Sequence, residues 1–369
     1  MLRRRSSTDI SSLVQNVKSA IRAGDTDTTR DNKVLIPTGS TLLNLALSDS
    51  KEGGFSPATV VNLVGDSSAG KTFLLWTLFA EAVRHPILKN YRLIYDEPET
   101  AFFMKAEKLF GIRPGRVEMD EANRSETIQH WYRRIVKTIE DNRPFIYGLD
   151  SFDSLSSEEE VDLEAKLLKS GEDGGSYQMQ KPKLAGRILR RVTSRIEKTN
   201  SLVIVVSQTR DNIGVTFGEK KTRSGGNALR FYATHEVWLS VVNHEKRKDR
   251  EVGVNVRAKV KKNKLTGKLR IVEFPIYFDY GVDDIGSCID FLLAEGVWTR
   301  SGNKINTNGV FIDTRRDLLI SHIEESFSEN KLQALVEDTW RSIEASIQSG
   351  RKPKYAPVEN DGDQESWPE

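Results

Sequence analysis

Residues 59–83 read TVVNLV-GDSSAGKT-FLLWTLFAEAV, and this stretch decides the fold. Its middle block fits the pattern G-x-x-x-x-G-K-[ST] at every fixed position. An apolar, β-branched run precedes the block and a helix-like apolar run follows it, which is the strand–loop–helix context that the pattern requires. The stretch therefore predicts a loop that binds the phosphates of a nucleotide at the N-terminus of a helix.

Each residue type in this predicted loop would make a different contact with the nucleotide or its metal. Glycines let backbone N–H groups approach a phosphate, Lys71 reaches β- and γ-phosphate oxygens, and Thr72 offers a hydroxyl to Mg²⁺. The predicted nucleotide-binding residues are Gly65, Asp66, Ser67, Ser68, Ala69, Gly70, Lys71 and Thr72.

Carboxylates follow two other apolar runs. The run PFIYGL ends in Asp150, a candidate for the second Mg²⁺ contact, although an Asp at this place could also cap the next turn. The run LIY leads into Asp96, Glu97 and Glu99, one of which could orient or deprotonate an attacking water. Because ligands of open α/β sheets bind at the carboxyl ends of strands, we expect these groups beside the phosphate loop. Together they predict Mg²⁺-dependent ATP hydrolysis.

Composition limits the class of protein. The chain has 369 residues, 37% of them hydrophobic, which suits a globular protein of about two domains. No apolar run approaches the ~18 residues that a membrane span needs. The lone Cys288 forms neither an internal disulfide nor a four-ligand zinc site. We therefore expect a cytoplasmic protein that does not bind membranes.

Charge is distributed unevenly along the chain. Residues 181–270 hold 23 basic residues against 7 acidic ones, a local net charge of +16, whereas the whole chain carries only +2. Surface lysines scattered over a solvated face could produce part of this excess. Its size instead favours a polyanionic partner that binds one part of the molecule.

The order of strand-like and helix-like stretches predicts an α/β fold with a largely parallel central sheet. We expect an N-terminal helix and linker in residues 1–33, a core in 34–284, a small domain in 285–349 and a disordered acidic tail in 350–369. Apolar residues spaced three and four apart predict that the N-terminal helix is amphipathic over Thr8–Ala23. The predicted strands are Thr59–Val64, Arg92–Tyr95, Pro144–Leu149, Leu202–Ser207, Glu236–Val241 and Val254–Lys261.

One longer segment makes the interpretation specific. Residues 202–234 read LVIVVSQTRDNIGVTFGEKKTRSGGNALRFYAT, and they resemble a strand, a glutamine switch and the second DNA-binding loop of the bacterial RecA recombinases. The similarity includes GV-x-FG, GGNAL and FYA, the TGS before the phosphate loop, and VKKNK at 260–264, and it extends over about residues 36–347. The chain is identified as a divergent member of this family, of the kind that a phage could encode. The resemblance implies a RecA-like P-loop ATPase core and a small C-terminal α/β domain.

The resemblance also implies roles for individual residues. Gln208 matches the residue that senses the γ-phosphate, while Lys262 and Lys264 match a pair that reaches the ATP of the neighbouring subunit. Arg257 and Lys259 match a secondary site that receives the incoming duplex. The residues that match positions at the primary DNA site are Arg190, Arg210, Ile213, Gly214, Phe217, Gly225, Gly226 and Asn227.

The implied activity is that of an ATP-dependent recombinase. Such a protein forms a helical filament on single-stranded DNA, pairs it with homologous double-stranded DNA and exchanges strands, with single-strand-binding or loader proteins as further possible partners. The N-terminal helix would dock on the next subunit. A ring-forming DNA motor with the same P-loop core, or a scaffold that binds ATP and DNA without turnover, are the alternative functions.

Two departures from the family pattern affect the predicted site. The family has one glutamate two residues beyond the strand-ending Asp, and the run Asp96-Glu97-Pro98-Glu99 has one residue more. We prefer Glu99 as the catalytic residue because TAF follows it as in the family, and Glu97 is the alternative. Where the family stacks adenine on tyrosines, this sequence has Ala106 and Phe278.

Overall fold

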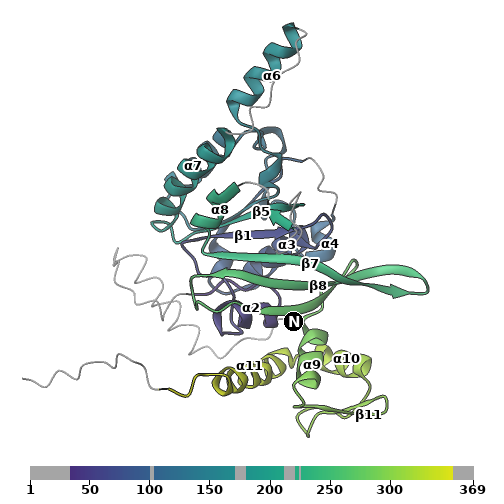
Figure 1. Cartoon of the computed structure of the whole chain (residues 1–369). Helices are drawn as coiled ribbons and strands as arrows, with labels where there is room; N and C mark the ends of the chain where they lie inside the picture. The colour runs from purple at the N-terminus through teal and green to yellow at the C-terminus, as the bar shows by residue number, and fades with distance from the viewer. Residues whose placement is uncertain (1–33, 100–103, 171–179, 212–220, 224–225, 352–369) are drawn as a thin grey trace, which may run out of the picture.

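A ten-stranded sheet is the centre of the computed structural model, which describes residues 34–99, 104–170, 180–211, 221–223 and 226–351 (Figure 1). Strand β6 (Lys221–Arg223) pairs with β5 at the side of this sheet. The other strands, in the order in which they lie, are β10 (Gly281–Val282), β9 (Ile271–Tyr277), β8 (Arg250–Asn263), β7 (His235–Arg247), β1 (Thr59–Gly65), β5 (Leu202–Asp211), β4 (Phe145–Leu149), β2 (Arg92–Asp96) and β3 (Val117–Glu118).

The sheet is parallel from β7 through β3 and antiparallel from β7 to β10. Strand β1 lies in the middle and is buried on both faces, which explains why apolar residues stand at successive positions on either side of Asn62 rather than at alternate ones. Parallel neighbours require crossover connections, and helices supply them. The predicted α/β fold with a largely parallel central sheet is confirmed.

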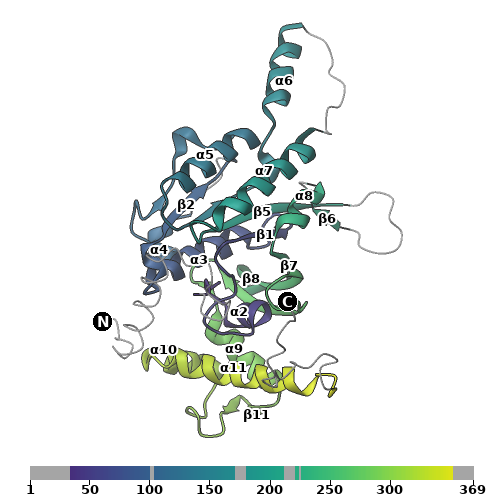
Figure 2. The same ribbon diagram turned by 90° about the vertical axis from the view of Figure 1, so that its left-hand side faces the viewer.

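Helices cover both faces of the sheet and produce two hydrophobic cores (Figure 2). The larger core lies under α2 and α3 and continues into the C-terminal helices, and the other lies under α5, α7 and α8. Trp76 is buried in the larger core and Trp131 in the other. The helices are α2 (Thr41–Ser48), α3 (Lys71–Arg84), α4 (Ala106–Phe110), α5 (Ile128–Glu140), α6 (Glu158–Ser170), α7 (Gln180–Ile196), α8 (Gly226–Tyr232), α9 (Asp284–Ala294), α10 (Arg316–Glu325) and α11 (Glu329–Ser346).

The C-terminal elements form a small α/β unit around the buried Trp298. Helices α9, α10 and α11 pack together, and the short strands β11 (Thr299–Ser301) and β12 (Lys304–Asn306) form a two-stranded sheet. Asp284 joins this unit to the core because its carboxylate accepts hydrogen bonds from the backbone N–H and hydroxyl of Thr41, at 2.6 and 2.7 Å.

Strands β7 and β8 are much longer than the sequence predicts. They continue as a hairpin beyond the edge of the sheet, on the right of Figure 1. The extension carries polar residues on both faces and is mostly exposed, so hydrophobic alternation gives no sign of it. Backbone pairing between Arg247 and Arg250 at its tip closes the hairpin.

His235 is a fully buried histidine at the start of β7. Its ring packs edge-on against Phe55, and neither ring nitrogen has a hydrogen-bond partner in the described part of the chain. Burial, with a smaller contribution from the charge of Lys262, lowers the pKa of His235 from 6.5 to about 3. The native state therefore holds this histidine neutral.

We expect His235 to make the fold sensitive to acid. Between pH 6.5 and about 3 the unfolded chain binds a proton at His235 that the folded chain does not, so this contribution to stability is complete above pH 6.5 and is lost as the pH falls. At pH 5 the loss should be about 2 kcal/mol. Urea unfolding of the wild type and His235→Leu at pH 7 and pH 5 measures the difference. An equally steep loss of stability in His235→Leu would contradict the assignment.

Candidate active site

The phosphate loop lies between the end of β1 and the start of α3, as its sequence context predicts. Ser68 and Gly70 adopt positive φ angles of 62° and 84°, so the loop curls before α3 begins at Lys71. A Cβ atom on Gly65 would lie 2.6 Å from the carbonyl oxygen of Leu239. The loop therefore needs glycine at that position for packing, and its N–H groups lie at the N-terminus of a 14-residue helix.

Lys71, Thr72 and Asp150 form the polar centre of this loop. The Lys71 ammonium donates hydrogen bonds to the carbonyl oxygens of Gly65 and Asp66, at 2.9 and 2.6 Å. The Thr72 hydroxyl donates to Asp150 Oδ2 at 2.7 Å, and the Tyr95 hydroxyl donates to the same oxygen at 3.1 Å. A hydroxyl and a carboxylate thus meet in the arrangement expected for a Mg²⁺–nucleotide site.

Burial shifts the pKa values of both charged groups at this centre. Desolvation lowers the pKa of Lys71, and the nearby carboxylates of Asp150 and Asp66 oppose the shift. Desolvation raises the pKa of Asp150, while hydrogen bonds from Thr72 and Tyr95 oppose it. Each charge reduces the cost of burying the other, so removing either one exposes the full desolvation penalty of its partner.

The carboxylates after β2 have different surroundings. Asp96 is buried, accepts hydrogen bonds from the Ser125 hydroxyl at 2.5 Å and from Tyr147, and pairs with Arg134 at 2.6 Å. These bonds hold Asp96 in a structural network. Glu97 and Glu99 remain as the two acids beside the phosphate loop.

Glu99 contacts β5 through Gln208. Ser154 Oγ donates to Glu99 Oε1 at 2.5 Å, and Gln208 Nε2 lies 3.4 Å from the same oxygen. Glu97 instead lies 4.0 Å from Nη1 of Arg124. The structure therefore brings together the preferred glutamate and the predicted γ-phosphate sensor, which lie 109 positions apart in the sequence.

A cavity of about 900 Å³ connects these groups. Besides residues 66–72 of the phosphate loop it is lined by Tyr95, Glu97, Glu99 and Asp150, so both candidate glutamates and the candidate Mg²⁺ ligand face the same space as the loop. Phe278 lines it as expected, and it is 47% exposed. Ala106 is not among its lining residues and packs against the hydrophobic core; Met104 lines the cavity on that side instead.

Two charged or titratable residues that line the nucleotide cavity were not predicted from the sequence. His244 and Glu251 come from the β7–β8 hairpin and form a cross-strand pair with 3.2 Å between Nδ1 and Oε2. Both lie in a charged stretch without a recognisable motif. The length of the hairpin, which appears only in the tertiary structure, brings them to the cavity.

Lys262 and Lys264 lie at the opposite edge of the sheet. The Lys264 N–H donates to the Thr234 carbonyl oxygen at 3.0 Å just before β7, and the Lys262 ammonium donates to the carbonyl oxygens of Arg230 and Phe231 at the end of α8. The phosphate loop follows the other end of β1, four residues or roughly 13 Å further along the paired strands. The two lysines therefore do not line the phosphate cavity of their own chain.

The structure describes some of the predicted DNA-binding residues and not others. Arg190 is exposed on α7 and Arg210 is exposed near the end of β5. The backbone of Gly226 and Asn227 forms the first turn of α8. Ile213, Gly214, Phe217 and Gly225 lie outside the described residues, as do the predicted N-terminal helix and nearly all of the predicted acidic tail. Arg257 and Lys259 are exposed on one face of β8, and Arg257 pairs with Glu273 at 2.7 Å.

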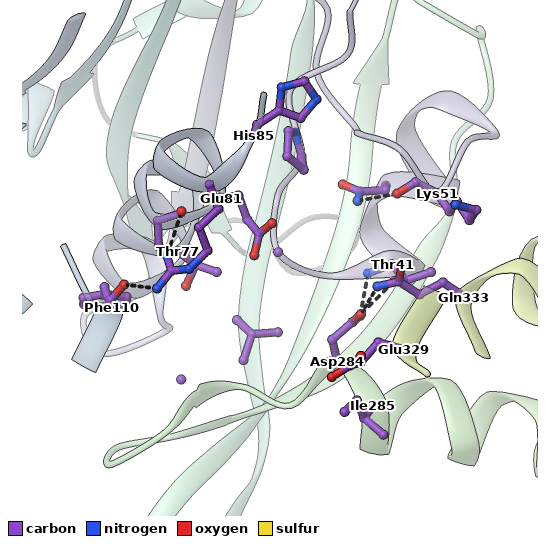
Figure 3. Close-up of a pocket in the computed structure, with 18 of the residues that line it drawn as sticks. Thr41, Lys51, Thr77, Glu81, His85, Phe110, Asp284, Ile285, Glu329 and Gln333 are labelled. Atoms are coloured by element: carbon purple, nitrogen blue, oxygen red, sulfur yellow. Dashed lines mark hydrogen bonds between the residues drawn. The ribbon is translucent and has the colours of Figure 1, made fainter. Parts of the chain in front are cut away.

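A second cavity lies away from the phosphate loop, between α3, α2 and the C-terminal helices (Figure 3). Its volume is about 540 Å³, and the carboxyl groups of Glu81 and Asp284 lie at it. Burial raises the pKa of both groups, and the charge of Asp284 raises that of Glu81 further. Thr41 and Gln333 donate hydrogen bonds to Asp284 and oppose the rise of its pKa, as drawn in Figure 3. No group of three or more metal-ligating side chains occurs within the described ranges, so we assign no metal here.

Comparison with known proteins identifies related sequences. A sequence model of the RecA N-terminal domain matches residues 14–283. Protein RecA 2 of Myxococcus xanthus is 28% identical over 307 residues, which is 83% of this chain and 81% of that protein. Protein RecA of Nostoc sp. (strain PCC 7120) is 28% identical over 341 residues, 92% of this chain and 90% of that protein, and Protein RecA of Thioalkalivibrio sulfidiphilus is 29% identical over 314 residues, 83% and 84% respectively.

The sheet order and the phosphate loop define a protein of the α/β class with a RecA-like core. The chain belongs to the RecA family and is a divergent RecA-type recombinase. Membership implies ATP-dependent, DNA-stimulated activity and the binding of DNA in an oligomer. None of the helices in the described part of the chain is long and apolar enough to cross a membrane.

Proposed function

We propose that this chain hydrolyses ATP with Mg²⁺ when it is assembled on single-stranded DNA, and that the resulting helical filament promotes homologous pairing and strand exchange. The observation that carries the proposal is the contact between Gln208 and Glu99. It connects the acid beside the phosphate loop to β5, the strand that leads directly into residues 212–227, where the RecA-like DNA-binding sequence lies.

The residues of the phosphate loop fit a nucleotide with its metal. Gly65–Thr72 would hold the phosphates, with Thr72 and Asp150 on the Mg²⁺ side and Lys71 on the γ-phosphate side. Bound ATP would supply a transferable phosphoryl group and Mg²⁺ would stabilise charge on its oxygens. Glu99 would hold the attacking water. Gln208 would couple the presence of the γ-phosphate to the position of β5, through its side-chain contact with Glu99 and the 2.6 Å hydrogen bond from its backbone N–H to Asp153.

The position of Lys262 and Lys264 supports a site completed by a second subunit. Because the pair lies at the far edge of the sheet from its own phosphate loop, a head-to-tail contact is needed to bring it to a nucleotide. Repetition of a head-to-tail contact that does not close generates a helical filament. Hydrolysis would then depend on assembly, and assembly on DNA would stimulate it.

The two glutamates can be separated by isosteric amides. Glu99→Gln is expected to lower the DNA-stimulated hydrolysis rate about 10²- to 10⁴-fold, because the amide cannot accept a proton from water. Glu97→Gln, the matched control, should retain most of the rate because Glu97 faces Arg124 rather than Gln208. Steady-state ATP hydrolysis with saturating single-stranded DNA measures both. The reverse order of the two rates would assign catalysis to Glu97.

The proposed function is tested by ATP hydrolysis with and without single-stranded DNA, read beside negative-stain images of the same mixtures. Strong stimulation together with extended helical filaments is the expected result, and strand exchange between homologous linear DNAs should follow. Closed rings would indicate a ring-forming motor. DNA binding with no hydrolysis at all would indicate a scaffold, and either result would overturn the proposal.

A further inference from the structure

We propose that Trp238 stacks on the bases of an unpaired DNA strand, within a basic strip formed by Trp238 on β7 and Arg257, Lys259 and Lys261 on β8. The inference rests on the proposed function in one respect, because it takes DNA as the ligand. It adds an aromatic residue that no family match assigns, and it specifies the form of DNA as single-stranded.

The strip lies on the face of the sheet that also carries α7 and α8. Trp238 is half-buried between the fully covered Val237 and Leu239, so its indole points to the opposite face of β7. Paired residues on adjacent strands share a face, and the register places Val64 and Lys259 on either side of Trp238. The indole therefore lies on the same face of the sheet as Val64 of β1 and Lys259 of β8.

One basic side chain contacts the indole, and two more lie on the same face of β8. The Lys261 ammonium lies 3.4 Å from the centroid of the Trp238 ring, and Lys259 is its direct cross-strand neighbour. Arg257 is one step further along the same face; it pairs with Glu273 and keeps 49% of its side chain exposed. A hydrogen bond of 2.8 Å from the indole N–H to Glu236 fixes the orientation of the ring. The ring is thus held in place with the Lys261 ammonium over its face and the Glu236 carboxylate at its N–H edge.

A fixed aromatic ring beside several cations is the arrangement that binds single-stranded nucleic acid without sequence preference. The bases stack on the ring, and the cations contact the phosphates between them. When a base takes the ring face, the long Lys261 side chain can move its ammonium to the adjoining phosphate. Bases in a duplex are already paired and stacked on one another, so the indole distinguishes an unpaired strand from a duplex.

The place of the strip in the sheet gives it a role in handling a second strand. The register row Ser207, Val64, Trp238 runs from β5 through β1 to β7. Trp238 is therefore two strands, or about 10 Å, from β5, which leads into the residues predicted to bind the first DNA strand. An unpaired strand on the strip would lie alongside the first one, where a displaced or incoming strand must be held.

Equilibrium binding of labelled oligothymidine to the wild type, Trp238→Ala and Trp238→Phe tests the inference directly. Binding is measured both to the free protein and to filaments preassembled on an unlabelled first strand with a non-hydrolysable ATP analogue. We expect Trp238→Ala to weaken the second-strand affinity at least about 5-fold, the smaller end of what one stacked base contributes. Trp238→Phe should restore most of it, because phenylalanine keeps an aromatic face.

An abasic oligonucleotide of the same length, with phosphates and sugars alone, separates stacking from charge. It should bind the wild type and Trp238→Ala equally, and a duplex of the same length should also be nearly insensitive to the change. Phe327→Ala removes an aromatic side chain that is 63% exposed at the end of α10 and should leave all affinities unchanged. Thermal unfolding of each variant shows whether replacement of the half-buried indole affects folding.

Equal affinity of Trp238→Ala and the wild type for oligothymidine, or an equal loss for the abasic strand, would overturn the stacking role. The proposed function is tested separately by the same samples. If the wild type shows DNA-stimulated hydrolysis and filaments while Trp238→Ala captures a second strand normally, the inference fails and the function stands. If the wild type forms no filament but free protein loses oligothymidine affinity in Trp238→Ala alone, the function fails and the stacking site stands.

Discussion

Replacement of Lys71 by alanine is expected to lower DNA-stimulated ATP hydrolysis by about 10³-fold. The Lys71 ammonium is buried, donates to two carbonyl oxygens of the phosphate loop and lies close to the carboxylate of Asp150. Alanine removes the positive charge that would stabilise the γ-phosphate as negative charge moves onto its oxygens. It also removes an ammonium that would contact the phosphates, so nucleotide binding should weaken as well.

Steady-state hydrolysis with saturating single-stranded DNA measures this effect. Lys304→Ala removes an exposed lysine on β12, far from the cavity, and should hydrolyse ATP like the wild type. Thermal unfolding would show whether Lys71→Ala keeps the fold. A folded Lys71→Ala protein that retains its DNA-stimulated turnover would remove the phosphate loop from the mechanism.

Replacement of Lys262 by alanine is the second change from which we expect a large effect, a loss of about 10³-fold or more in hydrolysis by the filament. Lys262 lies at the edge of the sheet opposite its own phosphate loop, where its ammonium contacts the end of α8. In a head-to-tail filament it would supply positive charge to the nucleotide of the next subunit, as an arginine finger does. Nucleotide binding by the isolated monomer should therefore be unchanged.

Mixing Lys71→Ala with Lys262→Ala makes this prediction decisive. Neither variant is active alone, but a Lys262→Ala subunit still has its phosphate loop and a Lys71→Ala subunit can still offer Lys262 to it. If subunits mix at random, about one quarter of the sites in an equimolar mixture regain both residues. Recovery of hydrolysis in the mixture is expected. No recovery, or a loss of nucleotide binding in monomeric Lys262→Ala, would place Lys262 in the site of its own chain.

Much of the fold could be predicted from local sequence. The apolar run before the phosphate loop becomes a buried central strand because parallel strands covered on both faces are apolar throughout. The runs that end near Asp96 and Asp150 became β2 and β4, parallel and adjacent, with their carboxyl ends at the phosphate loop. In contrast, the β7–β8 hairpin was underestimated because its outer part is polar on both faces and is held by backbone pairing.

The sequence by itself determined the chemistry available to this protein. The loop Gly65–Thr72, the acids near it, the basic stretch 181–270 and the RecA-like segment 202–234 are all local patterns, and their residue types limit what they can bind. Tertiary structure decided which residues share a site. In the folded chain Asp96 is bound in a buried hydrogen-bond network and Glu99 contacts Gln208. The fold also places His244 and Glu251 at the nucleotide cavity.

The same division applies to the surfaces. The fold places Lys262 at the edge of the sheet opposite its own phosphate loop. It also places Trp238, Lys259 and Lys261 on one face of the sheet. The physical reason is that strand order and register bring together residues that lie far apart along the chain. A one-residue change of register would reverse every side chain of a strand, and only the packed sheet fixes that register.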